Sequence, residues 1–297
     1  MSIFNLINNK LDFNENKNFT AIIGSNPSEG ARSPILWNYC FEQNKIDCKM
    51  LCFDVDENNI KKLIDELNNN KYFLGGAIAM PYKENIFNIL EKNISQESNN
   101  IGAINCLFRN NYGKLCGTNT DGEAALLALE EKTGKIENKK ILLLGPGGAG
   151  KAVSAYLLKS LKNSKNLFIS GRSNKGFEFS KKINCEFIEW NKFENIIEKF
   201  DIIINCTSVG SKNFEKNSPL SIKIIDKIKI DALVYDIIYD PSPTKLIYDL
   251  KQKNIKTIDG KKMNLLQAAL AFDYCININF RKFNTFDTML NIFKKLD

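Results

Sequence analysis

The stretch ILLLGPGGAGKA, residues 141–152, runs an apolar segment directly into a cluster of glycines. A buried strand followed by a glycine-rich turn and a helix is a common phosphate-binding arrangement in α/β proteins. Gly145, Gly147 and Gly150 have the spacing G-x-G-x-x-G, which is typical of dinucleotide-binding loops. The stretch therefore predicts an α/β fold with a nucleotide site at this turn.

The same glycines also fit a second class of phosphate-binding loop. Gly145, Gly150 and Lys151 match G-x-x-x-x-G-K, after which nucleoside triphosphatases place Ser or Thr because that hydroxyl ligates magnesium. Here the next residue is Ala152, whose methyl group binds no metal. Asp236, which ends the apolar run ALVYD, is available as a magnesium-binding aspartate. On this stretch alone the P-loop hydrolase interpretation is weakened but stays open.

The composition bounds the class of protein. With 297 residues, of which 43% are hydrophobic, the chain is long enough for two ordinary domains. The net charge of +7 comes from scattered lysines, with no run of like charges typical of a nucleic-acid-binding arm, so no nucleic-acid partner is expected. Histidine is absent, so acid-base chemistry must use Lys, Asp, Glu, Tyr or Cys.

The cysteines and the hydropathy pattern indicate an intracellular protein. The chain has eight cysteines and no C-x-x-C pair, so we expect reduced thiols and no metal site. The N-terminal segment lacks the apolar stretch of a signal sequence, and no window is apolar enough for a membrane helix. We therefore expect a cytoplasmic location and no membrane partner.

Strand-like and helix-like segments alternate along the chain. Apolar runs that end in turn residues indicate strands at 19–24, 49–55, 73–80, 103–109, 140–145, 166–171, 201–207 and 232–238. Segments with helical periodicity lie at 57–70, 83–93, 122–132, 150–162, 175–183 and 242–253. This alternation predicts parallel sheets covered on both faces, the α/β class.

The position of the glycine loop indicates the domain boundaries. A dinucleotide loop belongs after the first strand of its domain, but here a long α/β segment precedes it. We therefore expect an N-terminal substrate domain at 1–121 and a doubly wound, Rossmann-type nucleotide domain at 122–261. Residues 262–297, with closing helices at 263–280 and 286–296, are expected to return to the first domain.

The strand after the glycine loop indicates which dinucleotide binds. In a dinucleotide domain this second strand ends beside the adenosine ribose, where an acidic residue selects NAD and an arginine accommodates the 2′-phosphate of NADP. Here NLFISG is followed by Arg172 and Ser173, with Lys175 close behind. We therefore expect NADP(H). Its phosphates would be held by Gly145, Gly147, Gly148, Ala149, Gly150, Arg172, Ser173 and Lys175.

Two charged residues lie where a predicted strand gives way to a helix or loop. Lys83 follows the strand at 73–80 in MPYKEN, and Asp121 lies in GTNTDGEAAL. Strand ends are where α/β proteins place catalytic groups. Each residue also has an ordinary interpretation, a surface lysine in a first helical turn for Lys83 and a helix N-cap for Asp121.

Taken together, these segments resemble the shikimate dehydrogenase family over nearly the whole chain. The matching motifs occur in the family's order: GSNPSEGARSPILWN, MPYKE, GAIN, GTNTDG, GPGGAGKA, GRS, NCTSVG, YDIIYDPSPTKL and DGKKMNLLQAA. The resemblance implies that the glycine loop binds a dinucleotide, and that Lys151 is simply the next helical residue.

The resemblance also implies roles for individual residues. Lys83 and Asp121 would be the catalytic pair beside the carbonyl of a 3-dehydroshikimate-like substrate, which is reduced with NADPH. A desolvated lysine next to a carboxylate suits this chemistry, because the developing alkoxide needs a proton. The other implied residues are Asn105 and Gln267 for substrate hydroxyls, Ser33 and Tyr239 for its carboxylate, and Thr207 and Met263 for the cofactor.

The chain departs from the family in the substrate-binding segments. The family's Ser-x-Ser is reduced to Ala31 and Ser33, and its N-V-T-x-P segment reads Ala77, Ile78, Ala79, Met80, Pro81. Each missing hydrogen bond to a charged or polar group costs about 1.5 to 3 kcal/mol unless another residue, such as Ser28 or Arg32, replaces it. A related cyclic hydroxy-acid, quinate-like or less hydroxylated, is therefore an alternative substrate.

The sequence thus predicts an NADP-dependent dehydrogenase with a small-molecule substrate, acting as a monomer or a homodimer. Two remote alternatives stay open: a P-loop nucleotide hydrolase, and a non-catalytic protein that binds NADP as a sensor.

Overall fold

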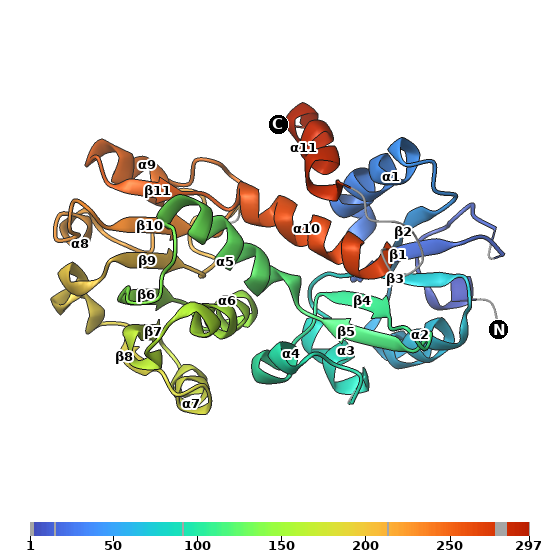
Figure 1. Cartoon of the computed structure of the whole chain (residues 1–297), viewed down its shortest axis with the longest axis horizontal. Helices are drawn as coiled ribbons and strands as arrows, with labels where there is room; N and C mark the ends of the chain where they lie inside the picture. Colours follow the sequence, from blue (N-terminus) through green and yellow to red (C-terminus); the bar gives the residue numbers. More distant parts are fainter. Residues whose placement is uncertain (1–2, 15, 91, 213, 277–283, 297) are drawn as a thin grey trace. The chain divides into compact units, whose positions relative to one another are not determined.

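The computed structural model describes residues 3–14, 16–90, 92–212, 214–276 and 284–296. The chain divides into two α/β units (Figure 1). One contains the chain up to Thr120 and from Leu265 onward, and the other contains Asp121–Asn264. The predicted α/β class is confirmed. We refer to the first as the substrate unit and to the second as the cofactor unit.

The substrate unit is built on a five-stranded sheet with strand order β2-β1-β3-β4-β5. The strands are β1 (Phe19–Gly24), β2 (Lys49–Asp54), β3 (Phe73–Ile78), β4 (Cys106–Arg109) and β5 (Leu115–Thr118). β1 pairs in parallel with β2 and β3, whereas β4 is antiparallel to both β3 and β5. The sequence predicted parallel strands only. The short turn after Arg109, in which Gly113 has a φ of 73°, is too short for a crossover and forces the antiparallel pairing.

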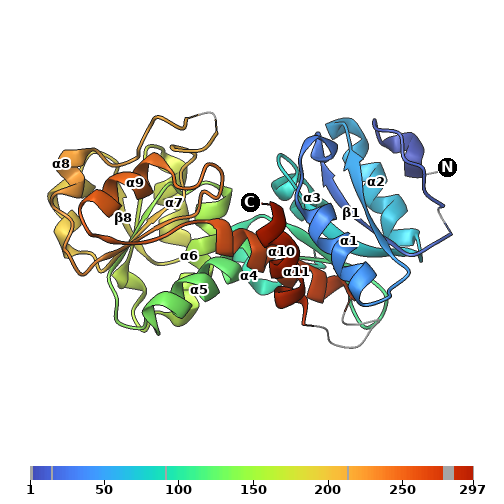
Figure 2. The same ribbon diagram turned by 90° about the horizontal axis from the view of Figure 1, so that it is seen from above.

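Helices cover both faces of this sheet. They are α1 (Ser33–Gln43), α2 (Glu57–Asn69), α3 (Lys83–Leu90), α4 (Gln96–Ile101), most of α10 (Lys261–Ile276), α11 (Thr285–Leu296), and the 3₁₀ turns η1 (Ile3–Leu6) and η2 (Pro27–Glu29). α2 is amphipathic, and its apolar side joins α3 and η1 in one buried cluster. α1, α10 and α11 form the other cluster. Figure 2 shows α1 and α2 on either side of β1.

The cofactor unit contains a six-stranded sheet in which all strands are parallel. The strands are β6 (Ile141–Leu144), β7 (Leu167–Gly171), β8 (Glu186–Glu189), β9 (Ile202–Asn205), β10 (Leu233–Asp236) and β11 (Lys256–Ile258). Their spatial order is β11-β10-β9-β6-β7-β8 (Figure 1). Counted within the unit this is the order 6-5-4-1-2-3 of dinucleotide-binding sheets, with a topological switch point between β6 and β9.

The cofactor unit's sheet is also covered on both faces. Its helices are α5 (Thr120–Thr133), α6 (Gly148–Ser160), α7 (Asn174–Lys182), α8 (Ile222–Ile225), α9 (Lys245–Gln252) and the 3₁₀ turns η3 (Ser164–Asn166), η4 (Phe193–Asn195) and η5 (Ile197–Lys199). Leu142, Leu144, Ile203 and Val234 point into one cluster with η4, η5, α8 and α9. The alternate residues of the same strands are also buried, and they face the opposite side.

The first of the two predicted closing helices is α10. It ends at Ile276 in the described part of the chain, and residues 277–280 of the predicted helix lie outside the described residues. The second is α11, which packs against α1. Among the described helices, none has the length and apolar character that a bilayer crossing requires.

Candidate functional site

The glycine loop joins β6 to α6 and is shaped for close approach of a ligand to the backbone. Gly145 has a φ of 92°, and a Cβ on Gly150 would meet the carbonyl oxygen of Gly145 at 2.1 Å. Both positions therefore require glycine. Gly147 and Gly148 are exposed, and a Cβ on either would meet no atom within 4 Å. The backbone at the start of α6 thus has open space beside it, as the close approach of a dinucleotide pyrophosphate requires.

The structure argues against the P-loop interpretation. Ala152 is fully buried in α6, so the position that would offer a magnesium ligand faces the protein core. Asp236, the candidate magnesium aspartate, is also fully buried and accepts hydrogen bonds within the unit. No cluster of metal-ligating side chains occurs among the described residues. The burial of Ala152 and Asp236 therefore favours the dinucleotide interpretation of the loop.

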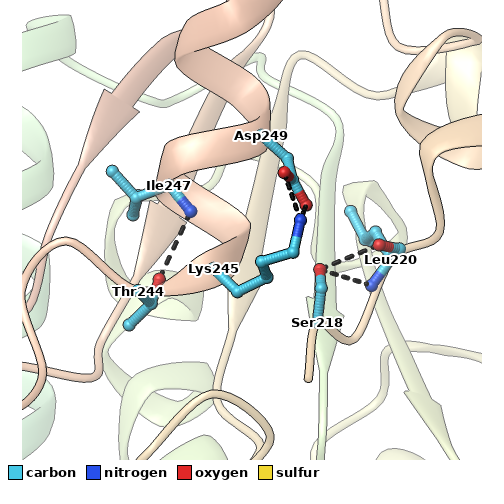
Figure 3. Close-up of polar contacts among 6 residues, drawn as sticks. All are labelled: Ser218, Leu220, Thr244, Lys245, Ile247 and Asp249. Atoms are coloured by element: carbon cyan, nitrogen blue, oxygen red, sulfur yellow. Dashed lines mark hydrogen bonds and ion pairs between the residues drawn. The ribbon is translucent and has the colours of Figure 1, made fainter. Parts of the chain in front are cut away.

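Asp236 instead organises the loops at the ends of β9 and β10. Its carboxylate accepts from Asn205 Nδ2 at 3.0 Å, from the Ile238 amide at 3.2 Å and from Thr244 Oγ1 at 2.7 Å. Thr244 also caps α9 by accepting from the Ile247 amide at 3.3 Å (Figure 3). Burial outweighs these hydrogen bonds and raises the pKa of Asp236 from 3.8 to about 6.

The first residue of α9, Lys245, forms an ion pair within the helix. Lys245 Nζ contacts both carboxylate oxygens of Asp249, at 2.5 and 2.6 Å, and the Asp249 side chain is largely buried (Figure 3). In the loop between β9 and α8, Ser218 donates to the Leu220 carbonyl at 2.8 Å (Figure 3). The Lys245–Asp249 pair and the Thr244 cap stabilise the first turn of α9, where Thr244 donates its hydrogen bond to Asp236.

The loop after β9 carries Thr207, which the sequence assigns to the cofactor. Asn205 Oδ1 accepts from the Thr207 amide at 3.0 Å and from its hydroxyl at 2.7 Å. Thr207 Oγ1 in turn accepts from the Val209 amide at 3.1 Å. A Cβ on Gly145 would lie 2.8 Å from Thr207 Cγ2, so this loop borders the glycine loop across the switch point. Thr207 thus shapes the loop in addition to any contact with a ligand.

A pocket of about 550 Å³ lies at the carboxyl ends of β7 and β8. Its lining consists of Gly171, Arg172, Ser173, Asn174, Phe177, Phe187, Ile188, Glu189 and Lys192. The lining includes Lys192, which the sequence analysis did not single out. The predicted Lys175 is not among these lining residues. The cationic and hydroxyl groups fit a phosphate, and the aromatic rings fit a base. Together with the glycine loop, the residues present fit NADP.

In the substrate unit, hydrogen bonds bring several predicted residues together. The Ile104 amide donates to the Lys83 carbonyl at 3.0 Å, which ties the start of α3 to the residue before Asn105. Asn105 Oδ1 accepts from the Thr120 amide at 2.7 Å, and Asn105 Nδ2 donates to Thr120 Oγ1 at 3.0 Å. Thr120 Oγ1 donates to the Gln267 carbonyl at 3.0 Å. Asn105 and Thr120 are buried, so this network fixes the start of α5.

Thr120 immediately precedes Asp121 and was not identified from the sequence. The sequence did offer a clue to Thr120, because it directly precedes Asp121 in the motif GTNTDG. Lys83 and Asp121 are each half-buried in the first turn of a helix, α3 and α5 respectively. The network therefore positions the backbone from which the carboxylate of Asp121 extends.

The altered substrate frame lies at the ends of β1 and β3. Ala31 and Ala79 are half-buried and pack against the cluster of α1, α10 and α11. Ser28, a possible replacement donor, gives its amide hydrogen to Asp54 at 2.9 Å and its hydroxyl hydrogen to the same carboxylate. Because a hydroxyl has one proton, Ser28 does not replace the donor missing at Ala31. Arg32 stacks on Phe293, with its guanidinium carbon 5.7 Å from the ring centroid.

The remaining predicted residues are dispersed over both units. Ser33 is the first residue of α1 and is half-buried. Gln267 is half-buried in α10, where Met263 is buried. Tyr239 follows β10 and its side chain is exposed. These placements leave their assigned roles as predictions.

The fold and these residues define an NADP-dependent dehydrogenase built from a substrate unit and a Rossmann-type unit. The family profile "Shikimate dehydrogenase substrate binding domain" matches residues 22–107, and "Shikimate / quinate 5-dehydrogenase" matches residues 127–260. A shikimate dehydrogenase (NADP(+)) of Methanococcus maripaludis is 36% identical over 266 residues, 88% of this chain and 92% of that protein. The chain belongs to the shikimate dehydrogenase family.

Solved structures agree with this assignment. A shikimate dehydrogenase crystallised in complex with NADP+ has a TM-score of 0.82 and 29% identity, covering 96% of this chain and 97% of that one. The ligand-free 5-ketofructose reductase of a Gluconobacter strain has a TM-score of 0.80 at 22% identity, covering 95% and 99%. The second likeness shows the fold alone, so the substrate must be inferred from the substrate unit's own residues.

Proposed function

We propose that the chain catalyses the reversible, NADPH-dependent reduction of 3-dehydroshikimate to shikimate. The observation that carries the proposal is the hydrogen-bonded network of the substrate unit, in which Asn105 and Thr120 fix the residue before Asp121. The main chain of Lys83 is joined to the residue before Asn105. The glycine loop and Arg172 supply the matching cofactor site, and NADPH supplies the hydride when bound.

The two charged residues have complementary roles in this proposal. Lys83 donates a proton to the carbonyl oxygen as it becomes an alkoxide, and it takes the proton back in the reverse reaction. Asp121 supplies the carboxylate that keeps the lysine charged and oriented. Asn105 and Gln267 bind substrate hydroxyls, and Ser33 and Tyr239 bind its carboxylate. Thr207 and Met263 contact the nicotinamide end of the cofactor.

A second candidate substrate is a cyclic hydroxy-acid with fewer hydroxyls, or one that is quinate-like. The observation that favours it is the apolar packing of Ala31 and Ala79 where the family presents hydroxyls. Because Ser28 is held by Asp54, the first missing donor is not restored from that side chain. A ring acid that needs fewer hydrogen bonds would lose less at such a site.

The test is an assay of the purified full chain with separate substrates. NADPH with dehydroshikimate, NADPH with other ring keto-acids, and ATP with magnesium are incubated in parallel. The proposal predicts loss of NADPH absorbance with a ring keto-acid and no phosphate release from ATP. Binding of NADPH without turnover of any ring acid would favour a sensor and contradict the proposal.

The proposal includes the cytoplasmic location and the monomeric or homodimeric state expected from the sequence. Size-exclusion chromatography with light scattering measures the second.

A further inference from the structure

An aromatic side chain supports the arginine of the phosphate pocket. The guanidinium carbon of Arg172 lies 5.0 Å from the ring centroid of Trp190, within the range of a cation–π interaction. Arg172 follows β7, and Trp190 follows β8, the neighbouring strand of the sheet. The contact therefore joins the two strand ends that form the pocket.

Trp190 is itself held by the core of the cofactor unit. Its ring packs edge-on against Phe193, with the centroids 5.4 Å apart and the planes at 83°. Phe193 is 1% exposed and belongs to the cluster of η4, η5, α8 and α9, against which Trp190 is also packed. An exposed arginine is thus connected through a half-buried ring to a rigid part of the protein.

This cation–π contact suits recognition of a phosphate. A guanidinium held over an aromatic face makes no hydrogen bond to the ring, so its N–H donors stay available for two oxygens of a phosphate. A long side chain held in one place also loses less conformational entropy when its ligand binds. The indole carries no negative charge, so it adds no repulsion toward an anion.

The neighbours of Trp190 in the sequence complete the environment. Glu189 and Lys192 both line the pocket, and they form an ion pair at 3.0 Å. The pair neutralises the carboxylate that would otherwise face an incoming phosphate. Arg172 therefore remains the charged group whose placement decides how well the pocket binds an anion.

We propose that Trp190 is a positioning residue that holds Arg172 for the 2′-phosphate of NADP, and so sets the preference for NADP over NAD. The inference rests on the proposed function, because it takes Arg172 as the residue that binds this phosphate. Trp190 is not among the residues that line the pocket, and in this role it acts through Arg172.

The test compares two nucleotides that differ only in the 2′-phosphate. Adenosine 2′,5′-bisphosphate and adenosine 5′-monophosphate are titrated calorimetrically into the wild type, Trp190→Leu and Trp190→Phe. Trp190→Leu should weaken the bisphosphate roughly two- to fivefold and leave the monophosphate unchanged. Trp190→Phe keeps a ring on Phe193 but is a weaker partner for a cation, so it should give a smaller, equally selective loss.

An Arg172→Leu background supplies the control. There, adding Trp190→Leu should change bisphosphate affinity no further, because the side chain it positions is gone. Equal weakening of both nucleotides, or the same loss in the Arg172→Leu background, would overturn the proposal. If Trp190→Leu does not fold, the selective loss expected of Trp190→Phe decides in its place, and an unchanged bisphosphate affinity there overturns it.

The result also separates this inference from the proposed function. If the wild type prefers the bisphosphate and oxidises NADPH but the Trp190 variants keep that preference, only the inference fails. If the wild type does not distinguish the two nucleotides, the assignment of NADP as the cofactor fails with it.

Discussion

The two units place their functional groups by different physical means. In the cofactor unit, the key groups lie in loops that directly follow β6, β7 and β9, and much of the binding surface is backbone shaped by glycine. In the substrate unit, the side chains of Asn105 and Thr120 and the backbone carbonyls of Lys83 and Gln267 take part in hydrogen bonds between residues far apart in the sequence. Backbone geometry is specified locally, whereas a constellation of side chains depends on the tertiary fold.

The same comparison suggests a division of roles. In the proposed function, the substrate unit contributes Lys83 and most of the residues that frame the substrate. The cofactor unit contributes affinity and selectivity for NADP, together with Asp121 and Tyr239. The two sets of residues should therefore be separable by mutation.

The largest effect is expected from the catalytic pair. Lys83→Ala, and separately Asp121→Asn, should lower turnover roughly a hundredfold or more while NADPH still binds, because each removes the proton donor or its orienting partner. Steady-state kinetics and NADPH titration measure the two properties. Lys61→Ala, at an exposed position on α2, is the matched control. Near wild-type turnover of Lys83→Ala would break the division and favour the sensor alternative.

The next largest effect concerns the stability of the cofactor unit with pH. Asp236 has a folded pKa of about 6, above its ordinary value of 3.8, so the folded state holds this proton more tightly than the unfolded state. Ionisation therefore costs stability as the pH rises from about 4 to about 6. Relative to Asp236→Asn, the wild type should lose about 2.4 kcal/mol of unfolding free energy between pH 4 and pH 7.

Denaturation in a Trp37→Phe background measures this loss in the cofactor unit alone. The chain has two tryptophans, and Trp37 lies in α1 of the substrate unit, so the remaining fluorescence comes from Trp190. A difference between wild type and Asp236→Asn that is flat or rises with pH would show that Asp236 is not destabilised by burial.

A smaller effect is expected at the phosphate clamp. Arg172→Asp should weaken NADPH by about tenfold or more, because a charged hydrogen bond is lost and a carboxylate faces the 2′-phosphate. NADH lacks that phosphate and should bind nearly as before. Titration of both cofactors checks this, and equal losses would show that Arg172 does not bind the 2′-phosphate.

The smallest effect is a gain. If Ala31 and Ala79 mark a site adapted to another ring acid, the wild type should reduce dehydroshikimate with a high KM. Ala31→Ser with Ala79→Thr should then raise kcat/KM for dehydroshikimate roughly tenfold, at about 1 kcal/mol for each restored hydrogen bond. An efficient wild type that the double substitution impairs would mean that other groups already make these contacts, and the alternative substrate should then be dropped.

Much of the cofactor unit follows from its sequence. The apolar strands, the glycine loop and Arg172 are local patterns. In the structure, the glycine loop follows β6 and Arg172 follows β7. Trp190 and Lys192 could not be found in this way, because their relevance depends on β8 pairing with β7. The strand β8 itself is short and half-exposed, so it has no clear apolar pattern.

Less of the substrate unit could be read from its sequence. The antiparallel strand β5 is short and contains Gly117, so no strand was predicted there. The bond from Thr120 to Gln267 joins residues 147 positions apart and exists only once the fold has formed. The hydrogen bonds from Ser28 to Asp54 are likewise tertiary contacts. They engage the hydroxyl that the sequence analysis considered as a replacement for the missing donor.

The central claim is that this chain reduces a ring carbonyl with hydride from NADPH, using Lys83 as the proton donor. The most direct measurement uses NADPH deuterated at both C4 positions, with dehydroshikimate or the best ring keto-acid of the panel, and mass spectrometry of the hydroxy-acid product. The account predicts a product that is one mass unit heavier than with unlabelled NADPH, and almost none of it with Lys83→Ala. A wild type that forms no labelled hydroxy-acid from any ring acid in the panel, or an unimpaired Lys83→Ala, would contradict the account.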